Sequence, residues 1–271
     1  MRNKGTIEGT IQEIDFVKML NQKIDLSYWN ILNLDPNNHY AIRVITKKYG
    51  KLNESKVLPK ADAFIAKGSI ESDYLASKEY FLDENDVNKF NLEPITGSGI
   101  SIKRSDSKQY QIMKMSSSTF QKLFGSNILA SGASIYCNKE VEFIKNNKLL
   151  EAWGVSNSEF IDYFNQHLNI DLTSVTDSTS KENLKRIKKF SNEEIVKIIN
   201  NNKSISDFIF FGIGNFEEPF IAYWLYEYGE FKANYVIPFT VTTGSGRSKG
   251  VYTLVLKPKL IKINREIKNA K

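Results

Sequence analysis

Strand-like segments lie near both ends of the chain, and a long stretch with helical patterns lies between them. The strand-like segments are residues 40–46, 61–66, 99–103, 207–214 and 234–257, the last with two arms around a Gly/Ser-rich turn. Helical spacing of apolar residues covers 10–22 and much of 116–203. We expect strands from the two ends to pair with one another in a sheet, and the helices to cover the faces of that sheet. This order therefore predicts an α/β or α+β fold, with a mixed central β-sheet flanked by helices and a helical middle segment.

Two serines in the middle segment have the spacing of helix starts. Ser156 is followed three residues later by Glu159, and Ser191 by Glu194. In a capping box the serine and the acid bind each other's backbone N–H groups. We therefore expect one helix to begin after each serine.

The 271-residue chain contains one cysteine and two histidines. The lone Cys137 excludes an intramolecular disulfide framework and any zinc site built from several cysteines. No long linker rich in Pro, Gly or Ser divides the chain, which favours a single domain over residues 1–271. The first residues lack the apolar region of a signal peptide, and no apolar run approaches the length of a membrane span. We therefore expect a cytoplasmic protein with no membrane partner.

The formal net charge of +6 is concentrated at the C-terminal end. Residues 231–271 carry nine Lys or Arg and one Glu, a charge of +8, which leaves −2 for the rest of the chain. Such an asymmetric positive field is expected of a protein that binds a polyanion such as nucleic acid. A basic tail that only keeps the protein soluble accounts for the charge equally well.

An acid and a lysine stand at the ends of two apolar strand-like segments. Asp62 precedes one of them. In the other, Ile100 and Ile102 fall on one face of an extended chain, whereas Ser101 and Lys103 fall on the opposite face. Neighbouring strands can bring Asp62 and Lys103 to one sheet edge, where the carboxylate would bind Mg²⁺ and the lysine would act on water or phosphate. Taken singly, the aspartate could make a turn hydrogen bond and the lysine could protect an edge strand.

These residues carry a resemblance to a known family. The segments PKADAFI and GISIKRSDSKQYQIM resemble the catalytic core of PD-(D/E)XK nucleases, specifically type II restriction endonucleases with a PKxD, ISxK and Q arrangement. By that resemblance Asp62 is the metal-binding aspartate and Lys103 the catalytic lysine. Gln111 stands where such enzymes often carry a glutamine at the start of the next helix. The opening helix of the family often supplies an acid, for which Glu13 is the first candidate and Glu8 the second.

Two positions depart from the family pattern. Two residues separate Pro59 from Asp62, and Ser101 occupies the place of the usual second acid. A serine hydroxyl is a weak, neutral metal ligand. Either Glu13 supplies the second charge, or water and phosphate hold most of the metal, or the site is degenerate. The catalytic positions that the resemblance implies are Asp62, Ser101, Lys103 and Gln111, with Asp62 and Glu13 as metal ligands.

The resemblance also implies a restriction-endonuclease-like fold, a function and partners. It implies a Mg²⁺-dependent, sequence-specific endonuclease that hydrolyses phosphodiester bonds of double-stranded DNA as a homodimer, beside a cognate DNA methyltransferase. The single nuclease domain would contain a catalytic core at about 10–125, a helical segment at 126–203 and a β-rich, DNA-contacting part at 204–271. The alternative is a non-catalytic DNA-binding protein on a degenerate nuclease scaffold.

The last β-hairpin supplies most of the expected DNA contacts. Its turn, TGSGRSKG, lacks the GK[ST] ending of a phosphate-binding P-loop, which argues against a nucleoside triphosphatase. Arginine on a flexible turn can contact guanine with both ends of its guanidinium group, whereas lysines beyond the strand suit backbone phosphates. The expected DNA-binding residues are Arg247, Ser248, Lys249, Lys257, Lys259 and Arg104.

Three aromatic residues precede this hairpin. Trp224, Tyr226 and Tyr228 alternate along AYWLYEY, a segment whose pattern fits a helix or a strand. Large aromatic side chains dominate protein cores and interfaces. We expect these three in the core or in a subunit interface rather than on a platform for stacking bases.

Overall fold

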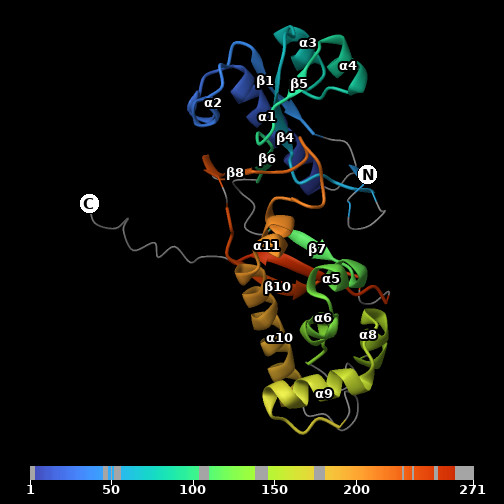
Figure 1. Ribbon diagram of the computed structural model, residues 1–271. Helices are drawn as coiled ribbons and strands as arrows, with labels where there is room; N and C mark the ends of the chain where they lie inside the picture. Colours follow the sequence, from blue (N-terminus) through green and yellow to red (C-terminus); the bar gives the residue numbers. More distant parts are fainter. Residues whose placement is uncertain are drawn as a thin grey trace, which may run out of the picture. The chain divides into compact units, whose positions relative to one another are not determined.

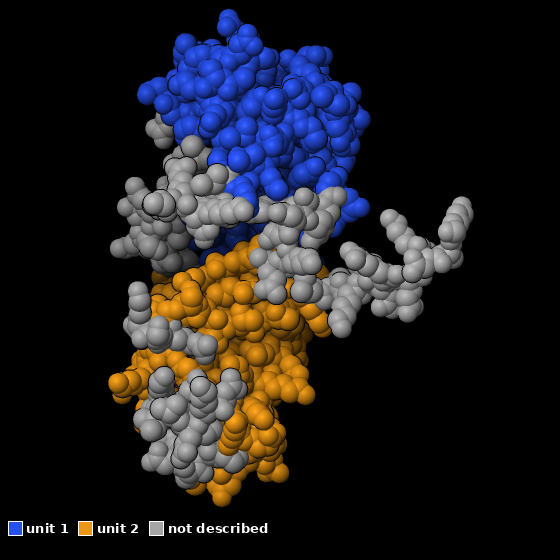
Figure 2. Space-filling model, turned by 180° about the vertical axis from the view of Figure 1, so that it is seen from behind, with its two compact units in different colours: residues 1–107, 203–236 blue, residues 108–202, 237–271 orange. Residues whose placement is uncertain are grey.

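A computed structural model describes most of the chain (Figure 1). The described residues are 4–44, 48–49, 51, 56–103, 110–137, 146–173, 181–227, 229–233, 235–246 and 250–259. The chain forms two compact units, each made from two separate segments (Figure 2). Unit 1 comprises residues 1–107 and 203–236, and unit 2 comprises residues 108–202 and 237–271. The single nuclease domain with three consecutive parts stays a prediction. The two compact units divide the chain at other positions, since each unit combines two separate segments.

Unit 1 is built on a mixed β-sheet. Its strands follow the order β1 (His39–Arg43), β4 (Ala63–Lys67), β6 (Ile100–Ile102), β8 (Trp224–Glu227) and β9 (Glu230–Ala233), and β5 (Glu93–Pro94) also pairs with β4. Strands β6 and β8 are parallel, and the other pairs in this sheet are antiparallel. The predicted mixed sheet with helices is therefore present.

The helices of unit 1 come from three parts of the chain. They are α1 (Lys4–Asn21), α2 (Ser27–Leu32), α3 (Ser72–Ser77), α4 (Glu84–Lys89) and α11 (Lys203–Phe210). Helix α1 buries Phe16, Val17 and Leu20 in the core of the unit, while Ile11 stays half exposed. Strand β4 buries its first four residues, as expected of an apolar strand covered on both faces. A separate pair joins β2 (Lys48–Tyr49) to β3 (Lys56–Val57).

Unit 2 combines a small antiparallel sheet with a helical part. The sheet order is β10 (Phe239–Thr243), β11 (Leu254–Pro258) and β7 (Met113–Met115). The helices are α5 (Ser117–Phe124), α6 (Ile128–Ser134), α8 (Asn146–Trp153), α9 (Asn157–Leu168) and α10 (Lys181–Asn201). Helix α6 approaches α10 closely because Gly132 has no side chain; a Cβ there would lie 2.2 Å from the Ser191 hydroxyl oxygen.

The sequence patterns predicted several of these elements. The helix at 10–22, the strands at 40–46, 61–66 and 99–103, and the two arms of the hairpin at 234–257 are all present. The capping box at Ser156 and Glu159 is confirmed at the start of α9.

Two expectations about secondary structure were wrong. Residues 207–214 were expected to form a strand, but residues up to Phe210 belong to α11, whose Ile205, Phe208 and Ile209 are buried at helical spacing. A short apolar run fits a strand or a buried helix equally well, and here the helical packing prevails. The expected helix start at Ser191 lies inside α10, where the serine is fully buried. Within the described part of the chain, no helix has the length and apolar character needed to cross a membrane.

Candidate active site

Two antiparallel strands bring Asp62 opposite the end of β6. Ala63 of β4 faces Ile100 of β6, and the Asp62 backbone N–H donates to the Ile100 carbonyl at 2.8 Å. Side chains alternate along β6, so Ile100 turns into the core and Ser101 turns to the opposite face. Because Asp62 precedes β4 and Lys103 follows β6, their side chains meet beside the sheet.

Three groups of one short segment surround the Asp62 carboxylate. The backbone N–H of Ile102 donates to its Oδ2 at 2.7 Å, and the Ser101 hydroxyl donates to the same oxygen at 3.2 Å. The Lys103 ammonium lies 3.5 Å from that oxygen, and both side chains are about one quarter exposed. The pairing of Asp62 and Lys103 that the sequence predicts is therefore present. Ser101 acts as a hydrogen-bond donor to the aspartate, at the place where the family pattern has an acid.

Glu13 reaches the same neighbourhood from α1. Its carboxylate lies 3.4 Å from the Arg43 guanidinium, and the two side chains are 25% and 3% exposed. The pKa of Glu13 is raised to about 7, first by burial and then by the negative charge of Asp62, against the lowering effect of Arg43 and Lys103. The carboxylate therefore shares an electrostatic environment with Asp62 and Lys103. Glu8, the second candidate, lies one turn earlier on α1 and is partly buried.

Arg43 was not predicted from the sequence as a site residue. It ends β1, and besides Glu13 its guanidinium donates to the Glu79 carbonyl at 3.1 Å. The only available signal was a charged residue inside the apolar segment YAIRVIT. Its side chain is almost fully buried, so its positive charge is positioned to compensate the carboxylate of Glu13.

Lys60 is a second residue that the sequence reasoning missed. Its ammonium donates to the Ile209 carbonyl near the end of α11 at 2.6 Å. The pKa of Lys60 is lowered to about 7, first by burial and then by the positive charge of Lys103, against the raising effect of Asp62. Lys60 stands in PKAD only two residues before the aspartate, which was the signal available. The site thus contains a second lysine, Lys60, whose pKa is lowered beside Lys103.

A tyrosine hydroxyl lies beside Ser101 on the side of the core. Tyr235 places its hydroxyl oxygen 3.2 Å from the Phe210 carbonyl and 3.4 Å from the Ala222 carbonyl. Burial raises the pKa of Tyr235 and the negative charge of Asp62 raises it further, while a hydrogen bond with Ser101 acts against this rise. The tyrosine is therefore a neutral neighbour that supports the serine.

The carboxylates of the site fit magnesium better than a metal that prefers nitrogen or sulfur. Among the described residues, no group of three or more His, Cys, Asp or Glu side chains could hold a metal ion. Magnesium commonly takes one or two carboxylates and completes its coordination with water and substrate phosphate. Within the described chain, the side-chain contacts of Asp62 converge on Oδ2 and leave Oδ1 for coordination. Asp62 and Glu13 are thus the pair that could hold Mg²⁺.

The other predicted residues belong to different parts of the chain. Gln111 is exposed in unit 2 and comes just before the strand β7, whereas the family's glutamine often stands at the start of a helix. The cause is visible at Ile112, whose backbone N–H donates to the Leu256 carbonyl and begins pairing with β11. Lys257 is partly buried in β11, and Lys259 is exposed just after it. Arg104, Arg247, Ser248 and Lys249 lie outside the described residues.

The arrangement in unit 1 offers a distinct chemistry. A carboxylate with an open oxygen, a second carboxylate with a raised pKa and a lysine at salt-bridge distance can bind a divalent cation and a phosphate together.

Comparison of the chain with models of known families, with curated proteins and with solved structures finds no match.

Proposed function

We propose that the protein is a Mg²⁺-dependent, sequence-specific endonuclease of double-stranded DNA, with the restriction-endonuclease-like fold and activity of the type II class. The observation that carries this proposal is the meeting of Asp62 and Lys103, 41 positions apart in the sequence, at 3.5 Å beside Glu13. A random match to a short motif gives no reason for its acid and its lysine to meet in space.

Each side chain has a role that its surroundings support. Asp62 and Glu13 would hold Mg²⁺, which when bound polarises a phosphate oxygen and lowers the pKa of a bound water. Lys103 would place its positive charge against the phosphate on which negative charge develops during hydrolysis. Ser101 and the Ile102 N–H fix the Asp62 carboxylate by holding Oδ2. These two hydrogen bonds restrict rotation of the Asp62 side chain, so the carboxylate is already oriented before a ligand binds.

Glu13 answers the question raised by Ser101. The serine brings no charge, so the second carboxylate must come from elsewhere, and α1 brings one to the same neighbourhood. Of the three alternatives that the sequence left open, the proximity of Glu13 supports the first. Arg43 would act as a positioning residue, because it contacts Glu13 from a buried site and does not itself reach Asp62 in the described contacts.

The expected partners follow from the resemblance and from charge. The C-terminal segment with a charge of +8 supports double-stranded DNA as the substrate. A homodimer, a cognate DNA methyltransferase and a cytoplasmic location are parts of the same proposal. Arg247, Ser248, Lys249 and Arg104 stay predicted DNA contacts.

Incubation with unmethylated plasmid or phage DNA tests the proposal. With Mg²⁺ the wild-type protein should produce discrete fragments, and with EDTA or with Asp62→Ala it should produce none. Asp73→Ala, which removes an exposed acid of unit 1, is the matched control and should cut normally. If the wild-type protein shifts DNA in a gel but never cuts it under any of these conditions, the non-catalytic alternative replaces the nuclease.

A further inference from the structure

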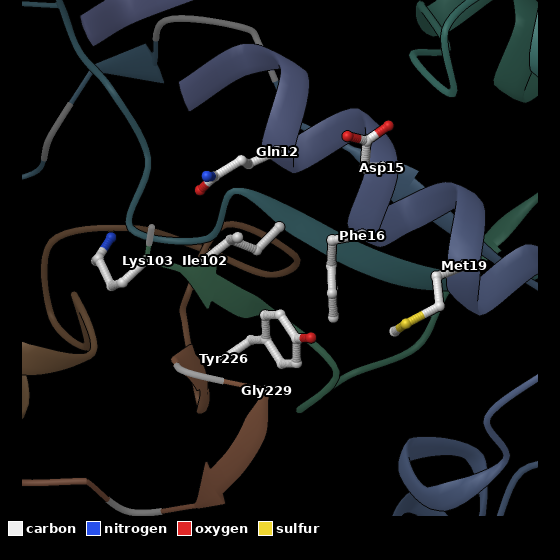
Figure 3. A pocket seen from close by; sticks show the side chains of 8 residues that line it. All are labelled: Gln12, Asp15, Phe16, Met19, Ile102, Lys103, Tyr226 and Gly229. Atoms are coloured by element: carbon white, nitrogen blue, oxygen red, sulfur yellow. The ribbon is translucent and has the colours of Figure 1, made fainter. Parts of the chain in front are cut away.

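A pocket of about 270 Å³ lies beside the candidate active site in unit 1 (Figure 3). Helix α1, the end of β6 and the turn between β8 and β9 form its walls. Its lining residues are Gln12, Asp15, Phe16, Met19, Ile102, Lys103, Tyr226 and Gly229. The volume is slightly below the range of about 300–1,000 Å³ that is typical of sites for drug-sized ligands. The pocket therefore suits a small ligand such as one ring system.

The lining combines aromatic and apolar surface with polar groups. In Figure 3 the rings of Phe16 and Tyr226 lie next to each other, with Met19 on one side and Ile102 on the other. The two ring centroids are 4.2 Å apart and Phe16 is buried, so a ligand would pack on the exposed part of the Tyr226 ring rather than between the rings. Gln12 adds an amide and Asp15 an exposed carboxylate. The pocket thus has a stacking surface and groups that can bind donors and acceptors.

Lys103 belongs both to this pocket and to the candidate active site. Its ammonium lies 3.5 Å from Asp62, while its backbone N–H donates to the Tyr226 carbonyl at 2.9 Å. A phosphate held by this lysine would therefore lie near the rim of the pocket that Lys103 and Tyr226 both line. The next group along a nucleic-acid strand is the sugar and its base.

We propose that this pocket binds one unpaired nucleobase of the strand whose phosphate Lys103 contacts. Stacking on aromatic rings combined with hydrogen bonds to the base edge is how proteins hold an unstacked base. A carboxylate accepts from an amino group of a base, and a glutamine amide can both donate and accept. The Asp15 carboxylate disfavours a second phosphate in the same place. The inference rests on the proposed function, since it takes the ligand from the DNA substrate.

Trp224 and Tyr226 pack against the core of unit 1, as expected for the aromatic segment, and the proposed role adds a ligand contact to Tyr226. Trp224 is partly buried and donates through its indole N–H to the Gly97 carbonyl at 2.9 Å, which suits a structural role. Tyr226 is also partly buried, but its ring lines the pocket. Its side chain is available to a ligand, as a tyrosine wholly enclosed in a core would not be.

Binding of single-stranded oligonucleotides in EDTA tests the pocket without cleavage and without the cost of unpairing. The full-length protein should bind a normal strand about tenfold more tightly than a strand of equal length in which every base is missing. Met19→Trp fills the pocket without changing the charge and should abolish this preference, while affinity for the base-free strand stays the same. Ile11→Trp is the matched control, because Ile11 is 51% exposed on the same helix and does not line the pocket. It should keep the preference.

Gln12→Ala gives a second test in case Met19→Trp fails to fold, and it should reduce the preference severalfold. Equal binding of the two strands by the wild-type protein would overturn the inference, and so would a preference that survives both variants. Free deoxynucleoside monophosphates that displace the strand at equal base concentration would also overturn it, because the site would then serve free nucleotides. Cleavage with Mg²⁺ is measured in a separate assay. Cleavage without a preference for strands with bases would refute only the base-binding proposal. A preference for strands with bases without cleavage would refute only the nuclease proposal.

Discussion

Unit 1 contains ion pairs that are mostly buried, whereas the described ion pairs of unit 2 are more exposed. In unit 1, Arg43 pairs with Glu13 at exposures of 3% and 25%, and Lys103 pairs with Asp62 at 24% and 27%. In unit 2, the ion pairs along α10 lie on its surface, where Lys189 and Glu193 are 78% and 64% exposed. Removing charges from water costs free energy that the pairing only partly returns, whereas exposed pairs contribute about 0–1 kcal/mol. These two pairs of unit 1 therefore carry a cost that the described pairs along α10 avoid.

The polar groups inside unit 2 sharpen this contrast. Its fully buried polar residues include Ser134, Asn146 and Ser191, all of which are neutral. Neutral polar groups can be tolerated where small helices pack closely, as α6 does against α10. Close packing does not account for a cluster of partly buried charges such as that in unit 1. Clusters of this kind are common at active sites and binding sites. The comparison thus supports unit 1 as the place of the proposed chemistry, and the following variants test this proposal.

The largest expected effect comes from Lys103. Lys103→Met should lower the rate of Mg²⁺-dependent cleavage by about 10²–10³-fold, because it removes the positive charge next to the scissile phosphate. DNA binding should change little. Lys189→Met in unit 2 is the matched control, since it removes an exposed lysine from a surface pair. Equal rates for the two variants in a single-turnover assay would show that the buried pair of unit 1 has no catalytic role.

Arg43 should have the largest effect on stability. Arg43→Met leaves Glu13 without its buried cation, which should cost about 3 kcal/mol of unfolding free energy at pH 8. The loss should be smaller at pH 6, because Glu13 has a raised pKa and can then be neutral. Denaturant titrations of the metal-free protein measure both values. Arg186→Met, on the exposed face of α10, should stay within about 0.5 kcal/mol of wild type at either pH.

The same contrast explains what the sequence could reveal. Asp62, Ser101 and Lys103 were predictable because alternation along a strand and pairing of neighbouring strands are local rules. Arg43 and Lys60 were not, because neither contact follows from strand alternation or from a motif: Arg43 meets Glu13 of a helix, and Lys60 meets the backbone carbonyl of Ile209. Such contacts depend on how a helix packs beside the sheet, which no local pattern records.

The expectations for secondary structure failed for a related reason. The run at 207–214 fits a strand by composition, but its segment packs as the helix α11. Ser191 and Glu194 have the spacing of a capping box, but α10 begins ten residues before Ser191, at Lys181, so no helix starts at this serine. Gln111 lies in unit 2, because the chain passes between the units after residue 107. Local propensity cannot decide cases that tertiary packing determines.

Glu13→Gln should separate stability from function. The folded protein keeps the Glu13 proton up to about pH 7, whereas the unfolded chain loses it near pH 4.5. Wild-type stability should therefore fall as pH rises from about 4.5 to 7, by roughly 2 kcal/mol from this group, and the variant should lack that fall. Cleavage by the variant should be slow and should require more Mg²⁺. An unchanged Mg²⁺ titration would transfer the metal role to another acid, such as Glu8.

Glu159 in unit 2 provides the control of opposite sign. Hydrogen bonds from the Ser156 hydroxyl and backbone lower the pKa of Glu159. The ionised Glu159 carboxylate should therefore stabilise the fold above its unfolded pKa, and this stabilisation should be lost as pH falls. Glu159→Gln should remove this small contribution at neutral pH. A denaturant series from pH 4 to 8 on both variants compares them directly. Parallel curves for Glu13→Gln and Glu159→Gln would contradict the contrast between the units.

The smallest expected effects concern the lysines of unit 2 proposed to contact DNA. Lys257→Ala and Lys259→Ala should each weaken binding severalfold to cognate and scrambled duplexes alike, because a phosphate contact carries no sequence information. Each should also reduce the slope of log affinity against log salt by about 1. Lys197→Ala removes the same charge from the exposed face of α10, where the lysine pairs with Glu194 at 3.2 Å. If Lys197→Ala lowers affinity and slope equally, net charge rather than contact explains the effect, and unit 2 has no DNA-binding face at β11.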